Sequence, residues 1–312
     1  RSSTFIIEDS HFDAYNPICA TTPPYLTTGV GILRCDVQCE ITANNTYFEG
    51  SRGADFTGTV YVGLSSATGS VRRCKKSEFK SCTFRQIPAV TVGGSEPSTA
   101  LFGAHLSVQA DGTNPNQYTV TNHRVESCNF SNTNGLPQYA IEGMPCYIIE
   151  GQDGFGAAFE FSGNQVRGGE GLYYSTLSNG SDNSAFHSGI KISNNHFMVK
   201  RRAIWIRPTS YYATSAPHWM APAMISSNII ELDNGAVANA ATGPSYGIYS
   251  TTVPIVASGN VIRGLSSSFQ MIGIKANKYS VLSGNSITGG GGGTQTSNPV
   301  RAEDGSVVAH NL

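Results

Sequence analysis

The sequence predicts an all-β solenoid, a single-stranded parallel β-helix of about ten rungs with loop insertions. The first observation is a strand-like motif whose clearest copy, Phe-Glu-Phe-Ser-Gly-Asn-Gln-Val, runs from Phe159 to Val166. The second is the return of this motif at steps of 25 to 46 residues, the size of one solenoid repeat. The third is that each copy alternates apolar and polar residues, which indicates strands with one buried face and not helices.

Each copy of the motif contains a small polar residue, called the key position below. Asn fills the key position in the second half of the chain, and Ser, Thr or Cys fills it in the first half. The key positions are Ser10, Thr46, Cys82, Cys128, Asn164, Asn195, Asn228, Asn260, Asn285 and Asn311. Because stacked Asn side chains can hydrogen-bond along a β stack, we expect these residues to form an inward polar ladder.

Two apolar columns accompany the key positions. Three residues earlier stand Ile7, Ala43, Phe79, Val125, Phe161, Ile192, Ile225, Ala257, Leu282 and Val308. Two residues later stand Phe12, Phe48, Phe84, Phe130, Val166, Phe197, Ile230, Ile262 and Ile287. Neither column contains an exception, so both are predicted to stack inside the coil, with roughly 4.8 Å between rungs.

Charged residues occupy outward columns. Four residues before successive key positions stand Glu78, Arg124, Glu160 and Lys191. Opposite charges on neighbouring strands stabilise a sheet by up to about 1 kcal/mol for each pair. A structural charge ladder is therefore one interpretation of Glu160.

Composition limits the possible partners. Only 13% of the residues are charged and the net charge is −1, which argues against a nucleic-acid partner. The apolar runs are short, so no membrane insertion is expected. The seven Cys match no zinc spacing and are typical of a reducing compartment, with Cys82 and Cys128 predicted to be buried. No Asp-rich calcium motif occurs, and we expect neither a metal nor a cofactor.

The repeat is continuous, so residues 1–312 are predicted to form one parallel β-helix domain. No amphipathic capping helix is visible at either end. Because open rungs are exposed strand edges, we expect a fragment of a longer chain that lacks its end caps. The largest insertions lie between the first seven key positions, and function is expected there because loops on a rigid scaffold often carry it.

Strands that end in Ser-Gly-Asn-x-Val/Ile, such as Ser258–Ile262, resemble the right-handed parallel β-helix of the pectate-lyase-like superfamily. Within it, the chain is most similar to the receptor-binding part of a bacteriophage tailspike. This resemblance implies a homotrimer of side-by-side β-helices in the virion tail, assembled in the bacterial cytoplasm. It also implies binding and cleavage of a bacterial surface polysaccharide (capsule or O-antigen).

Two alternatives remain open. The chain could be a secreted, free-acting polysaccharide lyase of the pectate-lyase type, or a glycan-binding adhesin without catalysis. A lyase needs a base and a group that neutralises a uronate, and Lys191, Arg167 and His187 are near enough in sequence to serve.

Hydrolysis of a glycosidic bond generally uses two carboxyl groups. They lie about 5–5.5 Å apart in retaining enzymes and about 6.5–9.5 Å apart in inverting ones. Neighbouring rungs can supply either separation. The catalytic pair is predicted to come from Asp153, Glu160 and Glu170, with Glu142 and Asp182 as further candidates.

Sugar recognition is expected from aromatic faces, with Arg or Asn on hydroxyls and carboxylates. The candidates for this role are Tyr173, Tyr174, Trp205, Arg207, Tyr211 and Trp219. If Ile204 and Ile206 point inward on a regular strand, Trp205 points outward.

Overall fold

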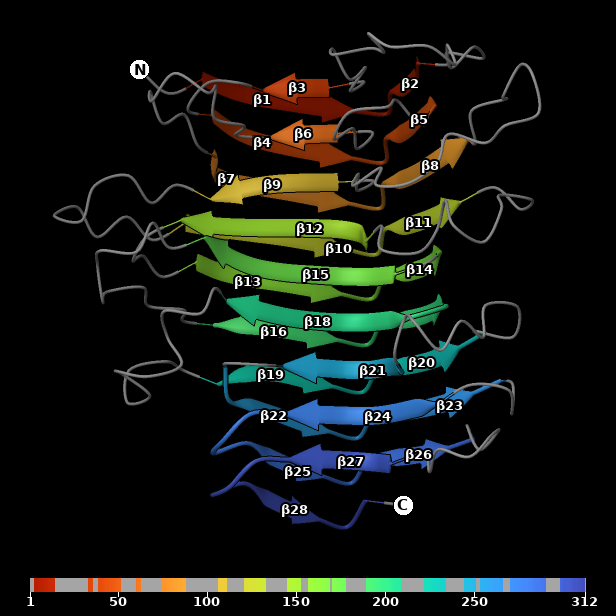
Figure 1. Ribbon diagram of the computed structural model, residues 1–312. Helices are drawn as coiled ribbons and strands as arrows, with labels where there is room; N and C mark the ends of the chain where they lie inside the picture. Colours follow the sequence, from red (N-terminus) through yellow and green to blue (C-terminus); the bar gives the residue numbers. More distant parts are fainter. Residues whose placement is uncertain are drawn as a thin grey trace, which may run out of the picture.

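The computed structural model describes the chain as a stack of parallel strands (Figure 1). The described residues are 3–14, 33–35, 39–51, 60–62, 74–87, 106–110, 121–132, 145–152, 157–168, 170–177, 189–208, 222–233, 244–250, 253–265, 270–289 and 298–311. Every strand pairing in this part of the chain is parallel, and each strand from β1 to β25 pairs with the strand three positions later. The prediction of an all-β parallel solenoid is thereby confirmed.

Three ladders of strands make up the stack. The first ladder contains β1 (Ser3–Glu8), β4 (Cys39–Asn44), β7 (Cys74–Lys80), β10 (Thr121–Glu126), β13 (Ala157–Ser162), β16 (Ile190–Ser193), β19 (Ala223–Ser226), β22 (Ile255–Ser258), β25 (Val281–Ser283) and β28 (Val307–Ala309). The second ladder contains β2 (His11–Ala14), β5 (Tyr47–Ser51), β8 (Thr83–Ile87), β11 (Asn129–Asn132), β14 (Gln165–Gly168), β17 (His196–Val199), β20 (Ile229–Leu232), β23 (Val261–Gly264) and β26 (Ser286–Thr288). The third ladder contains β3 (Leu33–Cys35), β6 (Val60–Val62), β9 (Leu106–Ala110), β12 (Pro145–Gln152), β15 (Glu170–Leu177), β18 (Arg202–Pro208), β21 (Ser245–Ser250), β24 (Met271–Ala276) and β27 (Asn298–Ala302).

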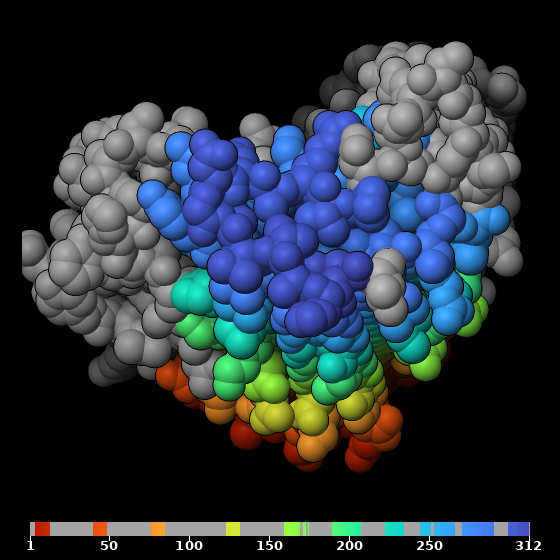
Figure 2. Space-filling model, turned by 90° about the horizontal axis from the view of Figure 1, so that it is seen from below, coloured from red at the N-terminus to blue at the C-terminus, as the bar shows by residue number. Residues whose placement is uncertain are grey.

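The first and third ladders lie on opposite sides of a common core. They meet at the Cys74–Ala110 pairing of β7 with β9, which joins them into one 19-stranded sheet, whereas the second ladder is a separate 9-stranded sheet. Figure 1 shows the third ladder in front of the first, and Figure 2 shows the stack end-on, with the C-terminal rungs nearest the viewer. Consecutive turns of the chain therefore repeat the same three strands.

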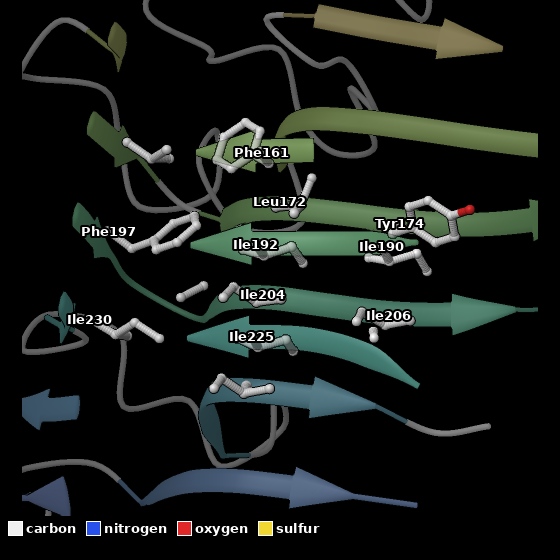
Figure 3. Close-up of a cluster of buried hydrophobic side chains, with 14 of the residues drawn as sticks. Phe161, Leu172, Tyr174, Ile190, Ile192, Phe197, Ile204, Ile206, Ile225 and Ile230 are labelled. Carbon is white, nitrogen blue, oxygen red and sulfur yellow. The ribbon is translucent and has the colours of Figure 1, made fainter. Parts of the chain in front are cut away.

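The two apolar columns predicted from the motif form the core. From Ala43 to Leu282 the column before the key positions is fully buried, and from Phe48 to Ile262 so is the column after them. Phe48, Phe84 and Phe130 stack on one another with ring centroids 5.1 and 4.7 Å apart. In the middle rungs the third ladder adds Leu172 and Ile204 to this core (Figure 3).

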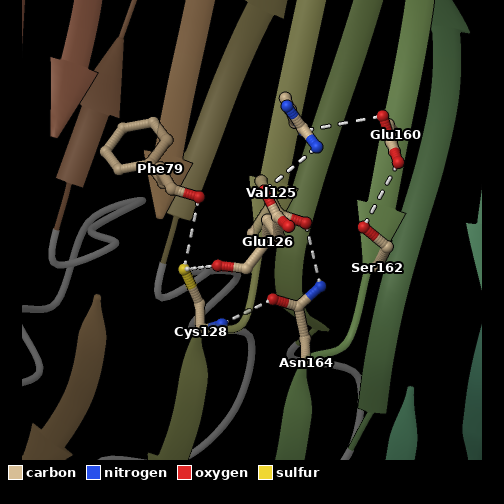
Figure 4. Close-up of polar contacts among 8 residues, drawn as sticks. Phe79, Val125, Glu126, Cys128, Glu160, Ser162 and Asn164 are labelled. Atoms are coloured by element: carbon tan, nitrogen blue, oxygen red, sulfur yellow. Dashed lines mark hydrogen bonds and ion pairs between the residues drawn. The ribbon is translucent and has the colours of Figure 1, made fainter. Parts of the chain in front are cut away.

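The polar ladder at the key positions is confirmed as well. In the Asn part of the ladder, each Oδ1 accepts hydrogen bonds from the backbone N–H and from Nδ2 of the preceding Asn. Asn164 Nδ2 donates to Asn195 Oδ1 at 3.0 Å and to Val125 O at 3.1 Å. Cys128 continues the ladder, because its N–H donates to Asn164 Oδ1 at 2.8 Å (Figure 4). Both thiols of the ladder, Cys82 and Cys128, are buried as predicted.

The residue before each key position has a positive φ. The residues are Asp9, Asn45, Ser81, Ser127, Gly163, Asn194, Ser227, Gly259, Gly284 and His310, with φ between 45° and 66°. Only Gly enters this left-handed region without steric cost, and Asn and Asp tolerate it better than most residues. The Ser-Gly-Asn signature is therefore a bend followed by the ladder residue.

One buried polar pair was missed from the sequence. His123 on β10 is fully buried, and its Nδ1 lies 2.8 Å from the Ser77 hydroxyl of β7 in an otherwise apolar column. Burial lowers the pKa of His123 to about 3, so the imidazole is neutral at physiological pH. Among the residues that the structure describes, no helical segment has the length and apolarity that a membrane crossing requires.

Candidate functional site

The outer face of the third ladder carries a column of aromatic and cationic residues. The strand register places Trp205 of β18 beside Tyr249 of β21, then Lys275 of β24 and Arg301 of β27. Trp205 is partly exposed while Ile204 and Ile206 on either side are fully buried, so the predicted outward direction of Trp205 is confirmed. We call Arg202, Trp205, Tyr246, Tyr249, Lys275 and Arg301 the aromatic–cation strip.

The rings of the strip are close to parallel. The planes of Trp205 and Tyr249 differ by 7° and those of Tyr246 and Tyr249 by 12°, with centroids 6.2 and 4.4 Å apart. Arg202 Cζ lies 3.5 Å from the centre of the Trp205 ring. Since carbon atoms in van der Waals contact are about 3.5–4.0 Å apart, Trp205 and Tyr249 are offset and do not cover each other fully. Arg202 lies over the Trp205 ring and Tyr246 is stacked on Tyr249, so the four side chains form a stacked cluster that spans two rungs.

Cationic side chains lie beside these rings. Lys275 Nζ lies 4.9 Å from the centre of the Tyr249 ring, within the range of a cation–π contact. Burial raises the pKa of Tyr246 above its usual value, and the positive charges of Lys275, Arg301 and Arg202 oppose that rise. Three cations from three strands therefore act on one phenol.

A second sequence pattern positions the strip, and this pattern was not recognised in the sequence. Each of its strands contains a small residue or Pro, an aliphatic residue and then the outward residue, as in Gly247-Ile248-Tyr249 and Gly273-Ile274-Lys275. A Cβ on Gly273 would lie 2.5 Å from Ile287 Cγ2 and 2.6 Å from the Pro299 carbonyl oxygen, so the close packing of the rungs requires glycine there. The same pattern in Gly171-Leu-Tyr, Ala203-Ile-Trp and Pro299-Val-Arg could have identified the column from the sequence.

The first ladder carries a charge cluster on its outer face. Arg124 pairs with Glu126 at 3.0 Å and with Glu160 at 3.5 Å (Figure 4). Glu160 Oε1 also accepts a hydrogen bond from Ser162 Oγ at 3.4 Å. The predicted charge ladder is therefore present between Arg124 and Glu160, and the structure gives Glu160 a role in holding neighbouring strands together.

Glu160 and Trp205 point away from each other. Phe159 and Phe161 flank Glu160 on β13 and point into the core, where Phe159 lies 5.6 Å from the Tyr174 ring of β15. Because the inner faces of β13 and β15 pack together, their outward residues lie on opposite sides of the solenoid. One sugar unit could not contact Glu160 and Trp205 of the same chain at once.

The prediction that Tyr174 contacts a ligand is wrong. Its side chain is 1% exposed and packs against Phe159, so Tyr174 is a core residue (Figure 3). Its neighbour Tyr173 is the register partner of Trp205 and belongs to the column of the strip.

The remaining predicted residues divide into two groups. Glu170 begins β15 and pairs with Pro145, and Arg207 near the end of β18 pairs with Ser175, so both belong to the third ladder. The other candidates lie outside the described residues: Asp153, Glu142, Asp182, Tyr211 and Trp219.

The second ladder carries a smaller polar pair. His196 Nε2 on β17 lies 2.9 Å from Glu231 Oε2 on β20, one rung away. Neither this pair nor any other part of the described chain brings together three or more His, Cys, Asp or Glu that could hold a metal ion.

Comparison of the chain with protein-family models, with curated proteins and with solved structures finds no match. The fold and the strip define the class: an all-β protein with long, all-parallel sheets, compatible with a parallel β-helix, that exposes an aromatic and cationic strip on one face.

Proposed function

We propose that the protein binds a bacterial surface polysaccharide along the aromatic–cation strip, as the receptor-binding part of a bacteriophage tailspike does. The observation that carries this proposal is the stacked cluster of partly exposed aromatic side chains around Trp205 and Tyr249, with cations beside it. Aromatic faces can stack on the C–H faces of sugars, while Arg and Lys donate hydrogen bonds to hydroxyl and acidic groups. The rigid strands beneath hold these side chains in place before a ligand arrives.

We further propose that the protein hydrolyses this polysaccharide with a pair of carboxylates. Glu170 is the better candidate of the two predicted carboxylates in the described strands, because it begins β15 and so belongs to the third ladder, which also carries the strip. Glu160 belongs to the opposite face and to the Arg124 ion pair. This assignment rests on position in the ladder.

A reducing-end assay on purified capsules and O-antigens tests both parts of the proposal. We expect Glu170→Gln to abolish product formation while glycan binding is retained, and Glu160→Gln to keep activity in the folded protein. Trp205→Ala should weaken binding, whereas Tyr279→Asn should not, because Tyr279 lies in the turn between β24 and β25 and is not part of the strip. Its φ of 61° also tolerates Asn, so this control should fold. Binding without any product would leave a receptor-binding adhesin, and an unsaturated product absorbing in the ultraviolet would indicate a lyase.

Self-association is a further part of the proposal. In the C-terminal half, the outer column of the first ladder is apolar and runs through Met224, Val256, Val281 and Val307, with Met224, Val281 and Val307 exposed. Exposed apolar patches mark interaction surfaces. A second copy with its axis parallel would match this column rung by rung and would leave the strip open on the opposite face.

The tailspike resemblance implies a homotrimer in a virion tail, and this apolar surface fits such an assembly. Sedimentation equilibrium should give a trimer for the wild type and a smaller species for Val281→Asp, with Lys191→Gln as the control on the same ladder. A wild type that stays monomeric at all concentrations would contradict self-association and would favour the free-acting secreted enzyme.

A further inference from the structure

Two free cysteines, Cys82 and Cys128, fill neighbouring key positions of the polar ladder, and both are buried. The strands before them, β7 and β10, pair in register, and so do the strands after them, β8 and β11. The two cysteines therefore lie opposite each other on adjacent rungs, with about one strand spacing, roughly 4.8 Å, between their backbones.

The two thiols are held in the same way. Cys82 Sγ lies 3.3 Å from the carbonyl oxygen of Lys80, two residues earlier in the chain. Cys128 Sγ lies 3.3 Å from the carbonyl oxygen of Glu126 in the same relation (Figure 4). Each sulfur also lies against a carbonyl oxygen of the preceding rung, at 3.3 and 3.4 Å. Because the two side chains have the same contacts one rung apart, their sulfurs are also separated by about one strand spacing, roughly 4.8 Å.

The cysteine pair lacks a link that the Asn rungs have. Asn164 Nδ2 donates to Asn195 Oδ1 on the next rung at 3.0 Å, so the amides join the two rungs side chain to side chain. Between the cysteine rungs the corresponding bond runs from the Cys82 backbone N–H to Cys128 Sγ at 3.4 Å. Burial raises the pKa of the Cys128 thiol, while the hydrogen bond with Cys128 lowers the pKa of Cys82. The two sulfurs therefore influence each other's protonation.

The spacing decides which bond suits the two sulfurs. A disulfide requires sulfurs about 2.05 Å apart and Cβ atoms about 3.8 Å apart, so it would draw the Cβ atoms about 1 Å closer than the strand spacing. A metal–thiolate bond is about 2.3 Å long, so an ion in line between two sulfurs holds them about 4.6 Å apart. The second distance matches the ladder with little movement of either rung.

The number of ligands limits the metal. Structural zinc is held by four ligands, and iron–sulfur clusters are typically held by four cysteines. The strands that the structure describes bring together no group of three or more His, Cys, Asp or Glu. Among the soft ions that select thiolates, monovalent copper is the one that is stable with two ligands in line.

We propose that Cys82 and Cys128 form a two-coordinate Cu(I) site that cross-links adjacent rungs inside the core, contrary to the expectation from the cysteine spacing that no metal is bound. Two S–H bonds break, two Cu–S bonds form and two protons leave, and no electron is transferred. The carbonyls that lose a thiol donor keep their backbone bonds, since Lys80 O accepts from the Asn45 N–H and Glu126 O from the Ser81 N–H, each at 3.0 Å. The site is independent of the proposed glycan binding.

Refolding in the presence of Cu(I) tests the site, because the buried sulfurs are accessible before the rungs close. The complete chain is refolded from urea without oxygen, with Cu(I) held by the coloured chelator bathocuproine disulfonate as the probe. We expect the wild type to withdraw one more Cu(I) per chain than either Cys82→Ser or Cys128→Ser. Copper should raise the urea midpoint of the wild type alone, and its binding should tighten as the pH rises, because protons leave.

The Ser variants should fold, since Ser10 fills a key position with its Oγ 2.8 Å from the Glu8 carbonyl oxygen. Cys146→Ser, on β12 of the third ladder, is the control and should bind as much copper as the wild type. X-ray absorption of the copper-loaded control should show two sulfur neighbours. Equal copper content of the wild type and the two Ser variants would overturn the proposal. A Cys82–Cys128 disulfide that forms in air and persists in the folded protein would also overturn it, because the rungs would then accept the shorter bond.

Discussion

Replacing Asn228 with alanine tests the polar ladder at its centre. Asn228 is fully buried, and its Oδ1 accepts from the Asn195 N–H at 3.1 Å and from Asn195 Nδ2 at 2.9 Å. Its Nδ2 donates to Ile192 O at 3.1 Å and to Asn260 Oδ1 at 2.9 Å. The substitution removes these four hydrogen bonds and keeps the backbone of β19 and β20.

The cost follows from which partners keep another bond. Asn195 Nδ2 still donates to Phe161 O, and Asn260 Oδ1 still accepts from the Asn228 N–H. The Ile192 carbonyl lies in β16, which pairs with β13 and β19, and keeps its backbone bond in the sheet, whereas the Asn195 N–H loses its side-chain partner inside the core. One unsatisfied buried group costs about 1–3 kcal/mol, so Asn228→Ala should lower the free energy of unfolding by about 1–3 kcal/mol. This is a sizeable part of the roughly 5–15 kcal/mol that stabilises a typical domain.

Urea unfolding combined with hydrogen–deuterium exchange of peptides from β16 and β19 measures the effect. Because neighbouring rungs supply most contacts in a solenoid, exchange should accelerate most around Asn195 and Asn228, by about 30-fold or more for 2 kcal/mol. Ser226→Ala, an outward change on the same strand, is the matched control. If the free energies of unfolding of the two variants differ by less than about 0.5 kcal/mol, the side-chain hydrogen bonds of Asn228 do not stabilise the fold.

Two further substitutions test other parts of the core. Because burial lowers the pKa of His123 to about 3 while an unfolded His keeps about 6.5, the unfolded state binds more protons between these values. Stability should therefore fall as the pH drops from about 6.5 toward 3, by up to roughly 1.4 kcal/mol per pH unit, and Ser77→Ala/His123→Phe should flatten that part of the urea-midpoint profile relative to the wild type. Gly273→Ala should lower the free energy of unfolding by about 1–3 kcal/mol or more, since its Cβ would meet backbone in the next rung, and a thermal midpoint equal to that of Ser283→Ala would contradict the clash.

The inner columns could be predicted because each turn of the coil repeats one physical requirement. The residue before the key position must accept a left-handed φ, the key position must hydrogen-bond along the stack, and the flanking positions must be apolar. These requirements act together on a fixed short motif, so Ser258-Gly-Asn260 identifies its place without any long-range information. The Ser77–His123 pair escaped prediction because a buried His in an apolar column has no local signal.

The strands of the third ladder could not be aligned with one another from the sequence in the same way. Its strands lack an Asn marker, and the steps from Trp205 to Tyr249 and on to Lys275 are 44 and 26 residues because the intervening loops differ in length. Where two neighbouring residues of a strand are alike, the sequence also does not show which of them points into the core. Tyr173 and Tyr174 are adjacent and chemically identical, and only the burial of Leu172 establishes that Tyr174 is the inward member.

Trp205 has both a structural contact and a proposed ligand contact, and one substitution can separate them. Trp205→Ala removes an aromatic stack of about 0.5–1.5 kcal/mol and a cation–π contact of about 0.5–1 kcal/mol, so unfolding should become easier by roughly 1–2.5 kcal/mol. If the ring served the fold alone, the folded variant would bind the surface polysaccharide as the wild type does. If the ring contacts sugar, affinity should fall by tenfold or more where the variant is fully folded, and Trp205→Tyr, which keeps a flat face, should restore much of it. Unchanged affinity in folded Trp205→Ala would remove Trp205 from the binding surface.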